Sequence, residues 1–311
     1  MQKCGVGGCS RLAVAYIPYS GRNMCRRHFM DFFERRVFRT IRKFRLFRPH
    51  ARVAVALSGG KDSSVALIMV KKLASEKKFP LEIVAISVDE GVGEYRRSLL
   101  KNARSLCEKL GVEHVVVSFK EELGIAIEDI AGISREKRES TCTYCGVFRR
   151  YLLNKTAREM GCECIVLGHN LDDLAQTFIM NMLRNEPDRL VRLGPKAGVV
   201  SHKKFVTRVK PLIETPEKEV AVYAILSGIP LKFMPCPYAH EAYRSEVRNF
   251  LNMLEENQPG TKYRLLNSFM VVKEALSHSE GNPNECIRCG ELTNAEVCKT
   301  CELLCKLGVR R

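Results

Sequence analysis

Cysteine is the residue type with the most chemical potential in this chain, because 14 of the 311 residues are cysteines. Ten of them, together with one histidine, fall into three groups, each of which contains a closely spaced pair. The sequence begins without the apolar segment of a secretory signal, so structural disulfides are not expected. Metal binding is therefore the leading interpretation of the grouped cysteines.

The first and last groups have the spacing of zinc sites, in which short loops supply four tetrahedral ligands in pairs. The first group predicts one zinc ion bound by Cys4, Cys9, Cys25 and His28. Its first pair is separated by four residues where two are usual, and scattered buried cysteines are the alternative. The last group contains two Cys-x2-Cys pairs and predicts a zinc ribbon at Cys286, Cys289, Cys298 and Cys301.

The middle group joins the pair Cys142 and Cys145 with the distant Cys236. A Cys-x2-Cys pair by itself fits a redox-active disulfide or half of a zinc site, so these residues alone leave the chemistry open. The other four cysteines are expected to be core or surface thiols: Cys107, Cys162, Cys164 and Cys305.

A glycine-rich segment, Ser58-Gly59-Gly60-Lys61-Asp62-Ser63-Ser64, is the strongest sign of nucleotide chemistry. It follows an apolar strand and precedes a helix, so its N–H groups can converge on an anion at the positive end of the helix. Lys61 and the serines add donors, and Asp62 is suited to hold Mg²⁺ against a pyrophosphate. The spacing is not that of a Walker A loop, and a generic glycine-rich turn is the alternative.

Strands that alternate with helices must position this segment. The apolar pattern predicts strands at 52–57, 81–88, 113–119 and 164–167 and helices at 65–73, 95–110, 145–160 and 171–183. This order is typical of a doubly wound parallel sheet in an α/β fold, which binds ligands at the carboxyl ends of its strands. Beyond Pro235 only helices are expected, at 240–256 and 262–277.

The charge of the chain indicates a polyanionic partner, because 51 Lys and Arg against 35 Asp and Glu give a net charge of +16. The segment from Phe29 to Arg52 predicts a helix, ended by Pro49, with an apolar stripe at Phe33, Val37, Ile41 and Phe44. Its other faces carry Arg35, Arg36, Arg39, Arg42, Lys43, Arg45 and Arg48. We interpret these cations as an RNA-binding surface, with a solvated charged face as the alternative. No apolar run is long enough to predict a membrane span.

The glycine-rich segment resembles the SGGxDS signature of the PP-loop ATP pyrophosphatases, which cleave ATP between its α and β phosphates and adenylate an acceptor oxygen. The strand end Ile86-Ser87-Val88-Asp89 resembles the adenine-contacting strand of these enzymes, and Gly168-His169-Asn170-Leu171-Asp172-Asp173 is similar to their G-H-x-x-D-D loop. The resemblance implies that ATP is bound by Ala56, Leu57, Ser58, Gly59, Gly60, Lys61, Asp62, Ser63, Ser64, Ser87, Val88, Gly168, His169 and Asp173.

The whole chain, with two terminal zinc modules and a cysteine triad, resembles the TtuA/NcsA family of tRNA 2-thiouridine synthetases. The resemblance implies a [4Fe–4S] cluster, with one iron free, on Cys142, Cys145 and Cys236, and catalytic roles for these thiolates, Asp62 and Asp173. ATP would adenylate the C2 oxygen of a tRNA uridine before sulfur replaces it. A structural zinc, a catalytic disulfide or a persulfide is the alternative for the triad. Cytidine 2-thiolation, lysidine formation and a non-catalytic zinc-dependent RNA-binding protein are the alternatives for the function.

The same resemblance implies tRNA as partner, a ubiquitin-like thiocarboxylate carrier protein or sulfide as sulfur donor, a homodimer, and a cytoplasmic location. The expected domains are an N-terminal zinc finger (1–30) with a basic helix (31–50), a PP-loop catalytic domain (51–235), a helical extension (236–280) and a zinc ribbon (281–311). Arg149, one helical turn after Cys145, is a candidate for contacting phosphate or the adenylate, and a surface role is the alternative.

Overall fold

A six-stranded sheet forms the centre of the computed structural model, which describes residues 2–76, 79–136, 140–197, 204–230, 236–238, 243–276 and 284–309. Its strands are β3 (Arg52–Ala56), β4 (Glu82–Asp89), β5 (Glu113–Ser118), β6 (Cys164–Val166), β7 (Lys196–Ala197) and β8 (Thr207–Val209). Their order is β5-β4-β3-β6-β8-β7, and all neighbours are parallel except β7 and β8. The predicted doubly wound α/β fold is confirmed.

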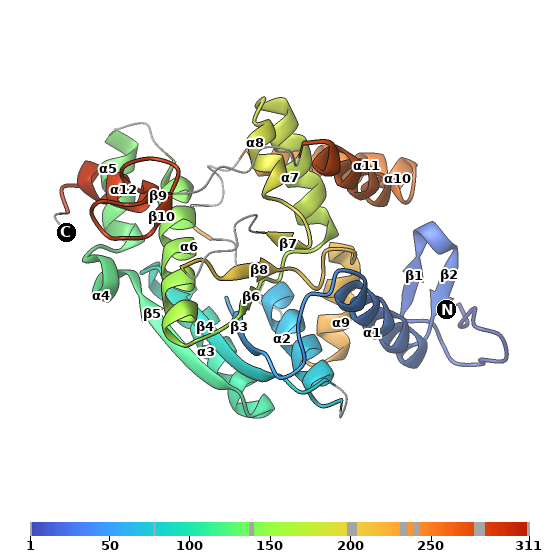
Figure 1. The fold of residues 1–311 in the computed structure, drawn as a ribbon. Helices are drawn as coiled ribbons and strands as arrows, with labels where there is room; N and C mark the ends of the chain where they lie inside the picture. The colour runs from blue at the N-terminus through green and yellow to red at the C-terminus, as the bar shows by residue number, and fades with distance from the viewer. Residues whose placement is uncertain are drawn as a thin grey trace.

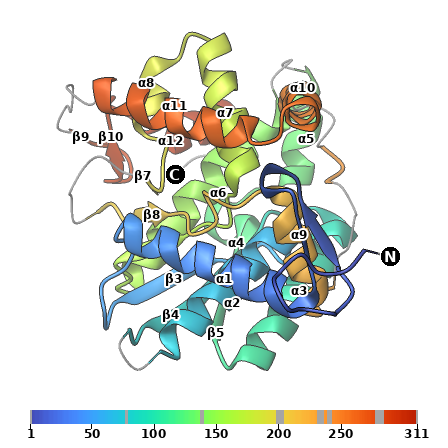
Figure 2. The same ribbon diagram turned by 90° about the vertical axis from the view of Figure 1, so that its right-hand side faces the viewer.

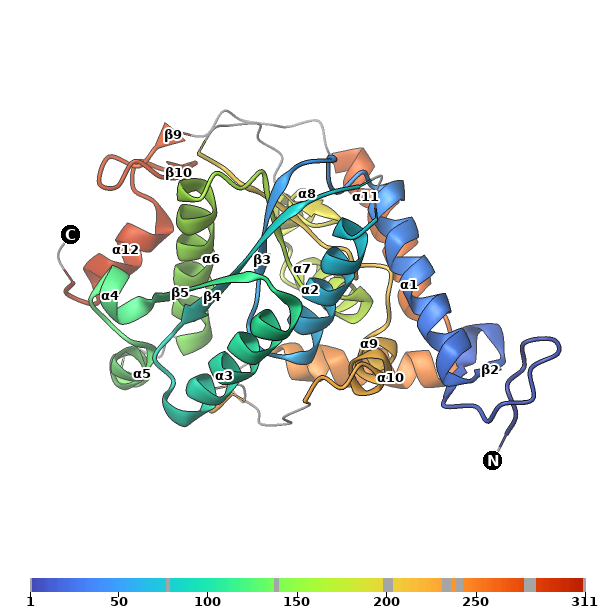
Figure 3. The ribbon, with the colours of Figure 1, turned by 90° about the horizontal axis from the view of Figure 1, so that it is seen from below.

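Helices cover both faces of the sheet because successive strand residues point to opposite sides and both sides are apolar. Val53 and Val55 share one core with α1 (Arg26–Lys43), α2 (Lys61–Ala74), α3 (Gly93–Leu110) and α9 (Glu217–Leu226). Ala54 and Ile165 share another with α4 (Phe119–Leu123), α5 (Ile127–Glu136), α6 (Thr141–Glu159) and α12 (Lys299–Lys306). Figure 3 shows α2 and α6 on opposite sides of the central strands.

A third group of helices has its own apolar contacts and consists of α7 (Leu171–Leu183), α8 (Pro187–Val191), α10 (Arg244–Asn257) and α11 (Thr261–Leu276). Phe178 packs against Phe269, and Ala175 against Leu251. These helices lie above the sheet in Figure 1, and α11 runs across α7 in Figure 2. Because α7 follows β6 closely, this group adjoins the carboxyl ends of the central strands.

A small module lies at each end of the chain. The N-terminal hairpin consists of β1 (Ala15–Ile17) and β2 (Arg22–Met24), joined by a short 3-10 turn (Pro18–Ser20), and it projects beside the start of α1 in Figure 1. The C-terminal hairpin consists of β9 (Asn284–Glu285) and β10 (Leu292–Thr293) and leads into α12. An ion pair between Glu291 and Arg158 holds this second module against α6.

The basic helix differs from its prediction in length and in one side chain. α1 ends at Lys43, well before Pro49, because Arg45 has φ 48° and the Leu46 N–H bonds back to the Ile41 carbonyl at 3.0 Å. This left-handed turn closes the helix as a Schellman motif. Arg36 is not on an RNA-facing surface, because it is buried against Glu219.

Other bounds also differ from the prediction. α6 begins at Thr141, so Cys142 and Cys145 both lie at its start. α10 begins at Arg244, and position 240, its predicted start, lies outside the described residues. The short strands β7, β8, β9 and β10 were not predicted, since two or three residues show no readable period. None of the described helices is long and apolar enough to cross a membrane.

Candidate active site and metal centres

The candidate phosphate-binding loop lies between β3 and α2, at the carboxyl end of a central strand. Its Ser58 and Ser63 hydroxyls lie 2.9 Å apart, and Ser63 Oγ donates to the Gly60 carbonyl at 3.0 Å. Gly59 has φ +83°, and a Cβ there would lie 2.0 Å from the Leu99 carbonyl oxygen, so glycine is required. Gly60 caps α2 without a side-chain hydrogen bond, which leaves the first N–H groups of the helix available to an anion.

The loop after β6 packs directly on the phosphate-binding loop. A Cβ on Gly168 would lie 2.7 Å from the Ser63 nitrogen, so the two backbones can approach only with glycine here. Asn170 and Asp173 form a capping box at the start of α7, in which Asn170 Oδ1 accepts the Asp173 N–H at 3.1 Å. Asn170 Nδ2 also donates to Asp62 Oδ1 at 3.1 Å, which orients that carboxylate.

Asp62 and Asp173 are partly exposed carboxylates beside the phosphate-binding loop, with side-chain exposures of 29% and 32%. Lys61 Nζ lies 2.9 Å from Asp62 Oδ2 and 2.8 Å from Glu217 Oε1, and Arg244 lies 3.7 Å from Asp173. Burial raises the pKa of both aspartates, and these neighbouring cations oppose the rise. Their carboxylate oxygens are the hard ligands that Mg²⁺ prefers alongside substrate phosphates.

Asp172, the neighbour of Asp173, serves the fold instead. It is buried and pairs with Lys262 Nζ, and its other oxygen accepts the Glu217 N–H at 2.7 Å. Lys262 also donates to Asn252 Oδ1 at 2.7 Å. These contacts fasten α9, α10 and α11 to the start of α7, so the two consecutive carboxylates have separate roles.

The strand ends predicted to contact adenine are well ordered by hydrogen bonds. Ala56 ends β3, and Ser87 Oγ donates to the Leu57 carbonyl at 2.6 Å and lies 2.7 Å from His114 Nε2. The Ser87 and Val88 side chains are buried. Contact of this strand with adenine remains a prediction.

The three cysteines of the middle group come from two segments that meet at the start of α6. The Cys142 thiol donates to the Tyr238 carbonyl at 3.6 Å, which brings the segment of Cys236 to this helix. Burial raises the pKa of the Cys145 thiol, Arg149 opposes the rise, and the nearby Cys236 adds to it.

The three thiols do not have the spacing of ligands to a single metal ion. One zinc ion requires ligand atoms within two bond lengths, about 4.6 Å, of one another. Among the described residues this triad does not form such a set, although two other groups do. An iron–sulfur cubane binds each thiolate to a different iron, so its cysteines are spread around a larger body.

A buried carboxylate connects Cys145 with the phosphate-binding loop. Arg149 Nη2 donates to Cys145 Sγ at 2.9 Å, and Arg149 Nε lies 2.8 Å from Glu90 Oε1. Glu90 Oε2 lies 2.8 Å from Arg96 Nε, and Arg96 Nη1 donates to the Ser58 carbonyl at 2.8 Å. We call Arg149, Glu90 and Arg96 the Glu90 bridge. The structure therefore places Arg149 between a thiol and a carboxylate.

His169 lies in a strongly cationic part of the site. Its side chain keeps contact with solvent, but the surrounding protein and the charges of Lys210, Arg244 and Arg149 lower its pKa to about 3. The imidazole is therefore neutral at physiological pH. A neutral ring can accept a hydrogen bond or stack on a base, and it adds no charge of its own.

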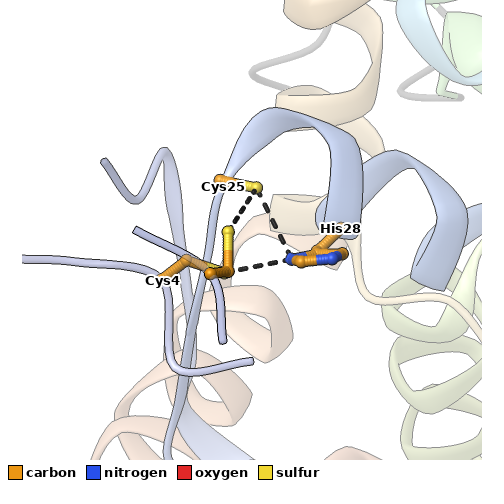
Figure 4. Close-up of side chains that lie close together, drawn as sticks. Cys4, Cys25 and His28 are labelled. Carbon is orange, nitrogen blue, oxygen red and sulfur yellow. Dashed lines mark hydrogen bonds between the residues drawn. The ribbon is translucent and has the colours of Figure 1, made fainter. Parts of the chain in front are cut away.

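Two sets of four ligands among the described residues satisfy the geometry of a single metal ion. They are Cys4, Cys9, Cys25 and His28, and Cys286, Cys289, Cys298 and Cys301, and the ligand atoms of each set lie within 4.8 Å of one another. Cys4 Sγ lies 3.2 Å and Cys25 Sγ 3.6 Å from His28 Nδ1, and Figure 4 shows these side chains turned toward one another. Both sets suit tetrahedral zinc, and the long first spacing does not prevent closure.

Comparison with known proteins extends this geometry. Residues 30–255 match the family model described as a PP-loop domain. The chain is 35% identical over 312 residues to the tRNA 2-thiolation protein NcsA of Haloferax volcanii, covering 95% of this chain and 97% of that protein. The chain belongs to the NcsA/TtuA family of PP-loop proteins. A second relative, the tRNA-5-methyluridine(54) 2-sulfurtransferase of Pyrococcus horikoshii, is 34% identical over 296 residues, covering 94% and 91%.

A solved structure supports the same assignment to the NcsA/TtuA family. The U34-tRNA thiolase NcsA from Methanococcus maripaludis with its [4Fe–4S] cluster superimposes with a TM-score of 0.84 at 34% identity. The match covers 100% of this chain and 98% of that chain. The likeness thus includes both terminal modules as well as the central sheet.

Sequence reasoning identified Arg149 as a candidate and missed the other two residues of the Glu90 bridge. The four ungrouped thiols are placed as expected, with Cys107, Cys162 and Cys164 buried and Cys305 exposed. Glu90 and Arg96 were missed, although an acidic residue just after the predicted strand 81–88 was a usable signal.

Proposed function

We propose that this chain is a tRNA sulfurtransferase that converts a uridine to 2-thiouridine with ATP. The observation that carries the proposal is the meeting of a phosphate-binding loop, a carboxylate loop and a cysteine triad at one edge of the sheet, joined by the Glu90 bridge. The similarity to tRNA 2-thiolation proteins, including one solved with a [4Fe–4S] cluster, supports it.

ATP binding follows from the open end of α2 and the hydroxyls around it. The N–H groups after Gly60, the Ser58 and Ser63 hydroxyls and Lys61 surround the β and γ phosphates, and Asp62 holds Mg²⁺ against the pyrophosphate. Asp173 completes the carboxylate pair. Adenine lies along the backbone of Ser87 and Val88.

The first chemical step is adenylation of the substrate. A uridine turned out of its stack presents its C2 oxygen to the α phosphorus, because a stacked base cannot reach the site. A bond forms between this oxygen and phosphorus, and pyrophosphate leaves. The loop contributes position and positive charge, which stabilise the charge that develops on the phosphates.

The second step exchanges oxygen for sulfur at C2. Sulfur bonds to C2, and the oxygen leaves with the phosphate as AMP. The residues that would hold a [4Fe–4S] cluster are Cys142, Cys145 and Cys236, and a cluster bound by three thiolates supplies an iron that can hold the incoming sulfur atom. Arg149 donates to Cys145 Sγ and keeps that thiolate oriented.

We also assign structural zinc to the two four-ligand sets and propose the domain divisions 1–30, 31–50, 51–235, 236–280 and 281–311 for the chain. The exposed arginines of the α1 region are proposed to contact tRNA: Arg35, Arg39, Arg42, Arg45 and Arg48. The sulfur donor is proposed to be sulfide or a ubiquitin-like thiocarboxylate protein, and the assembly a homodimer.

Anaerobic turnover with unmodified tRNA, ATP·Mg²⁺ and sulfide tests the proposal, with AMP and the digested nucleosides measured together. We expect 2-thiouridine and AMP in equal amounts. Formation of 2-thiocytidine or lysidine would assign a different PP-loop reaction. Tight tRNA binding without AMP would indicate a non-catalytic RNA-binding protein.

A further inference from the structure

Two arginines beside the cysteine triad form a cationic surface patch outside the Glu90 bridge. Arg150 lies on α6, five residues after Cys145, and Arg208 lies on β8. Arg208 Nη2 lies 3.5 Å from the Arg150 carbonyl oxygen, which joins the two segments, and its guanidinium lies 5.5 Å from the centre of the Phe205 ring. We call Arg150 and Arg208 the arginine pair.

Among the described residues, the arginine pair lacks the carboxylate partners that the buried Arg36 and Arg96 possess. Arg36 and Arg96 are buried, and each lies within ion-pair distance of a glutamate. In the part of the chain that the structure describes, no carboxylate lies within 4.0 Å of Arg150 or Arg208. Arg150 is exposed and Arg208 is half-buried, so two unpaired cations lie side by side where one anion can reach both of them.

Electrostatic repulsion between the two guanidinium groups also indicates that an anion binds between them. The surrounding protein lowers the pKa of Arg208 to about 10, and Arg150 adds to the effect. The surrounding protein also lowers the pKa of Arg150, with further contributions from Arg149 and Arg189. An anion between these guanidinium groups would relieve the repulsion.

The anion is not expected to be the triphosphate of ATP. The contacts of the phosphate-binding loop come from Arg96, Lys61 and the loop after β6, and those described for Arg150 and Arg208 do not include this loop. The Arg150 side chain instead turns back along α6 toward Cys145, because a Cβ on Gly146 would lie 3.4 Å from Arg150 Nη1. The arginine pair therefore lies beside the cysteine triad, where the acceptor base is proposed to react.

We propose that Arg150 and Arg208 bind a phosphodiester group of the RNA next to the nucleotide that enters the site. Planar guanidinium groups match phosphate oxygens in paired hydrogen bonds, which lysine cannot reproduce. Arg189 on α8 lies at the rim and is already paired with Glu186 at 3.0 Å, so it guides the strand and contributes less. This inference rests on the proposed function, since it takes the macromolecular substrate to be RNA.

The double variant Arg150→Gln/Arg208→Gln tests the site by fluorescence anisotropy with labelled unmodified tRNA. We expect about tenfold weaker binding, from lost hydrogen bonds to a charged group, and a log–log salt slope lower by about one between about 50 and 200 mM salt. Arg97→Gln is the matched control, because Arg97 is 74% exposed on α3 and pairs with Glu94 at the surface. Its slope should equal that of the wild type.

The variant Arg150→Lys/Arg208→Lys keeps both positive charges and removes the planar guanidinium groups. It is also less disruptive to folding than the glutamine variant. It should keep the wild-type salt slope while still binding tRNA more weakly. An unchanged slope and affinity in the glutamine variant overturns the site. So does a raised KM for ATP with unchanged tRNA binding, which would assign the anion to the nucleotide. Failure of the wild-type protein to bind or modify tRNA would refute the proposed function instead.

Discussion

Replacing Glu90 by Gln is the most informative perturbation of this site, because the amide keeps the volume of the side chain and removes its charge. Glu90 is 8% exposed and bridges Arg96, which is 5% exposed, and Arg149, which is 47% exposed. Loss of one partner from a buried ion pair costs about 3–5 kcal/mol. The half-exposed Arg149 contact adds less than about 1 kcal/mol, since solvent screens it.

This loss of stability should be visible in a melting experiment. For a domain of this size about 1 kcal/mol corresponds to about 2–4 °C, so Glu90→Gln should lower the melting temperature by about 6–20 °C. The variant should also raise the KM for ATP, because Arg96 loses the counter-charge that keeps it on the Ser58 carbonyl. The variant also removes the ion pair between Glu90 and Arg149, so the contact of Arg149 with Cys145 should change.

The assay combines thermal unfolding, the KM for ATP, and the visible absorption of the anaerobically reconstituted protein. Glu94→Gln is the control, because Glu94 is 80% exposed and its pair with Arg97 is a surface contact. It should leave all three measurements unchanged. A Glu90→Gln protein that melts with the wild type and keeps its KM for ATP would refute the reasoning that the bridge positions the loop.

Four further predictions concern the site and the core. Asp62→Ala should abolish AMP formation and leave tRNA affinity unchanged, because Asp62 is assigned to Mg²⁺; normal turnover would remove that assignment. The anaerobic protein should contain about four irons and two zincs per chain, and an alanine variant of Cys142, Cys145 or Cys236 should lose the iron and its absorption but keep the zinc. Lys262→Met should cost about 3–5 kcal/mol of unfolding free energy in urea, because it leaves the Asp172 charge buried and unpaired; a loss below about 1 kcal/mol would contradict this. Burial raises the pKa of Cys164 to about 12 and that of Cys107 to about 11, so both thiols stay protonated at pH 8 and should resist iodoacetamide in the native protein, whereas the exposed Cys305 should react.

The local features of the fold could be predicted from the sequence because they depend on periodicity and on special residues. The apolar pattern placed β3, β4 and β6 and located α7 at its observed bounds, 171–183. The glycines of the phosphate-binding loop indicated a backbone that other residues cannot adopt, as the close approach of Leu99 to Gly59 shows. The spacing of the cysteines also predicted the two four-ligand sets, because each set contains ligands that are close together in the sequence.

The roles of chemically identical residues were decided by the tertiary structure. Arg36 and Arg39 stand on the same helix, yet Arg36 is buried against Glu219 from α9 and Arg39 is exposed. Asp172 and Asp173 are consecutive, yet only Asp172 meets Lys262 from α11. In both pairs the difference is made by an element distant in the sequence.

The Glu90 bridge is also formed by residues that are distant in the sequence. Its members come from the end of β4, from α3 and from α6, and no local pattern relates Glu90 to Arg149 or to the Ser58 carbonyl. Periodicity in a sequence reports which face of one element is apolar, because that depends only on the geometry of a single helix or strand. Which charges meet inside the fold depends on how those elements pack, and only the assembled sheet with its helices determines it.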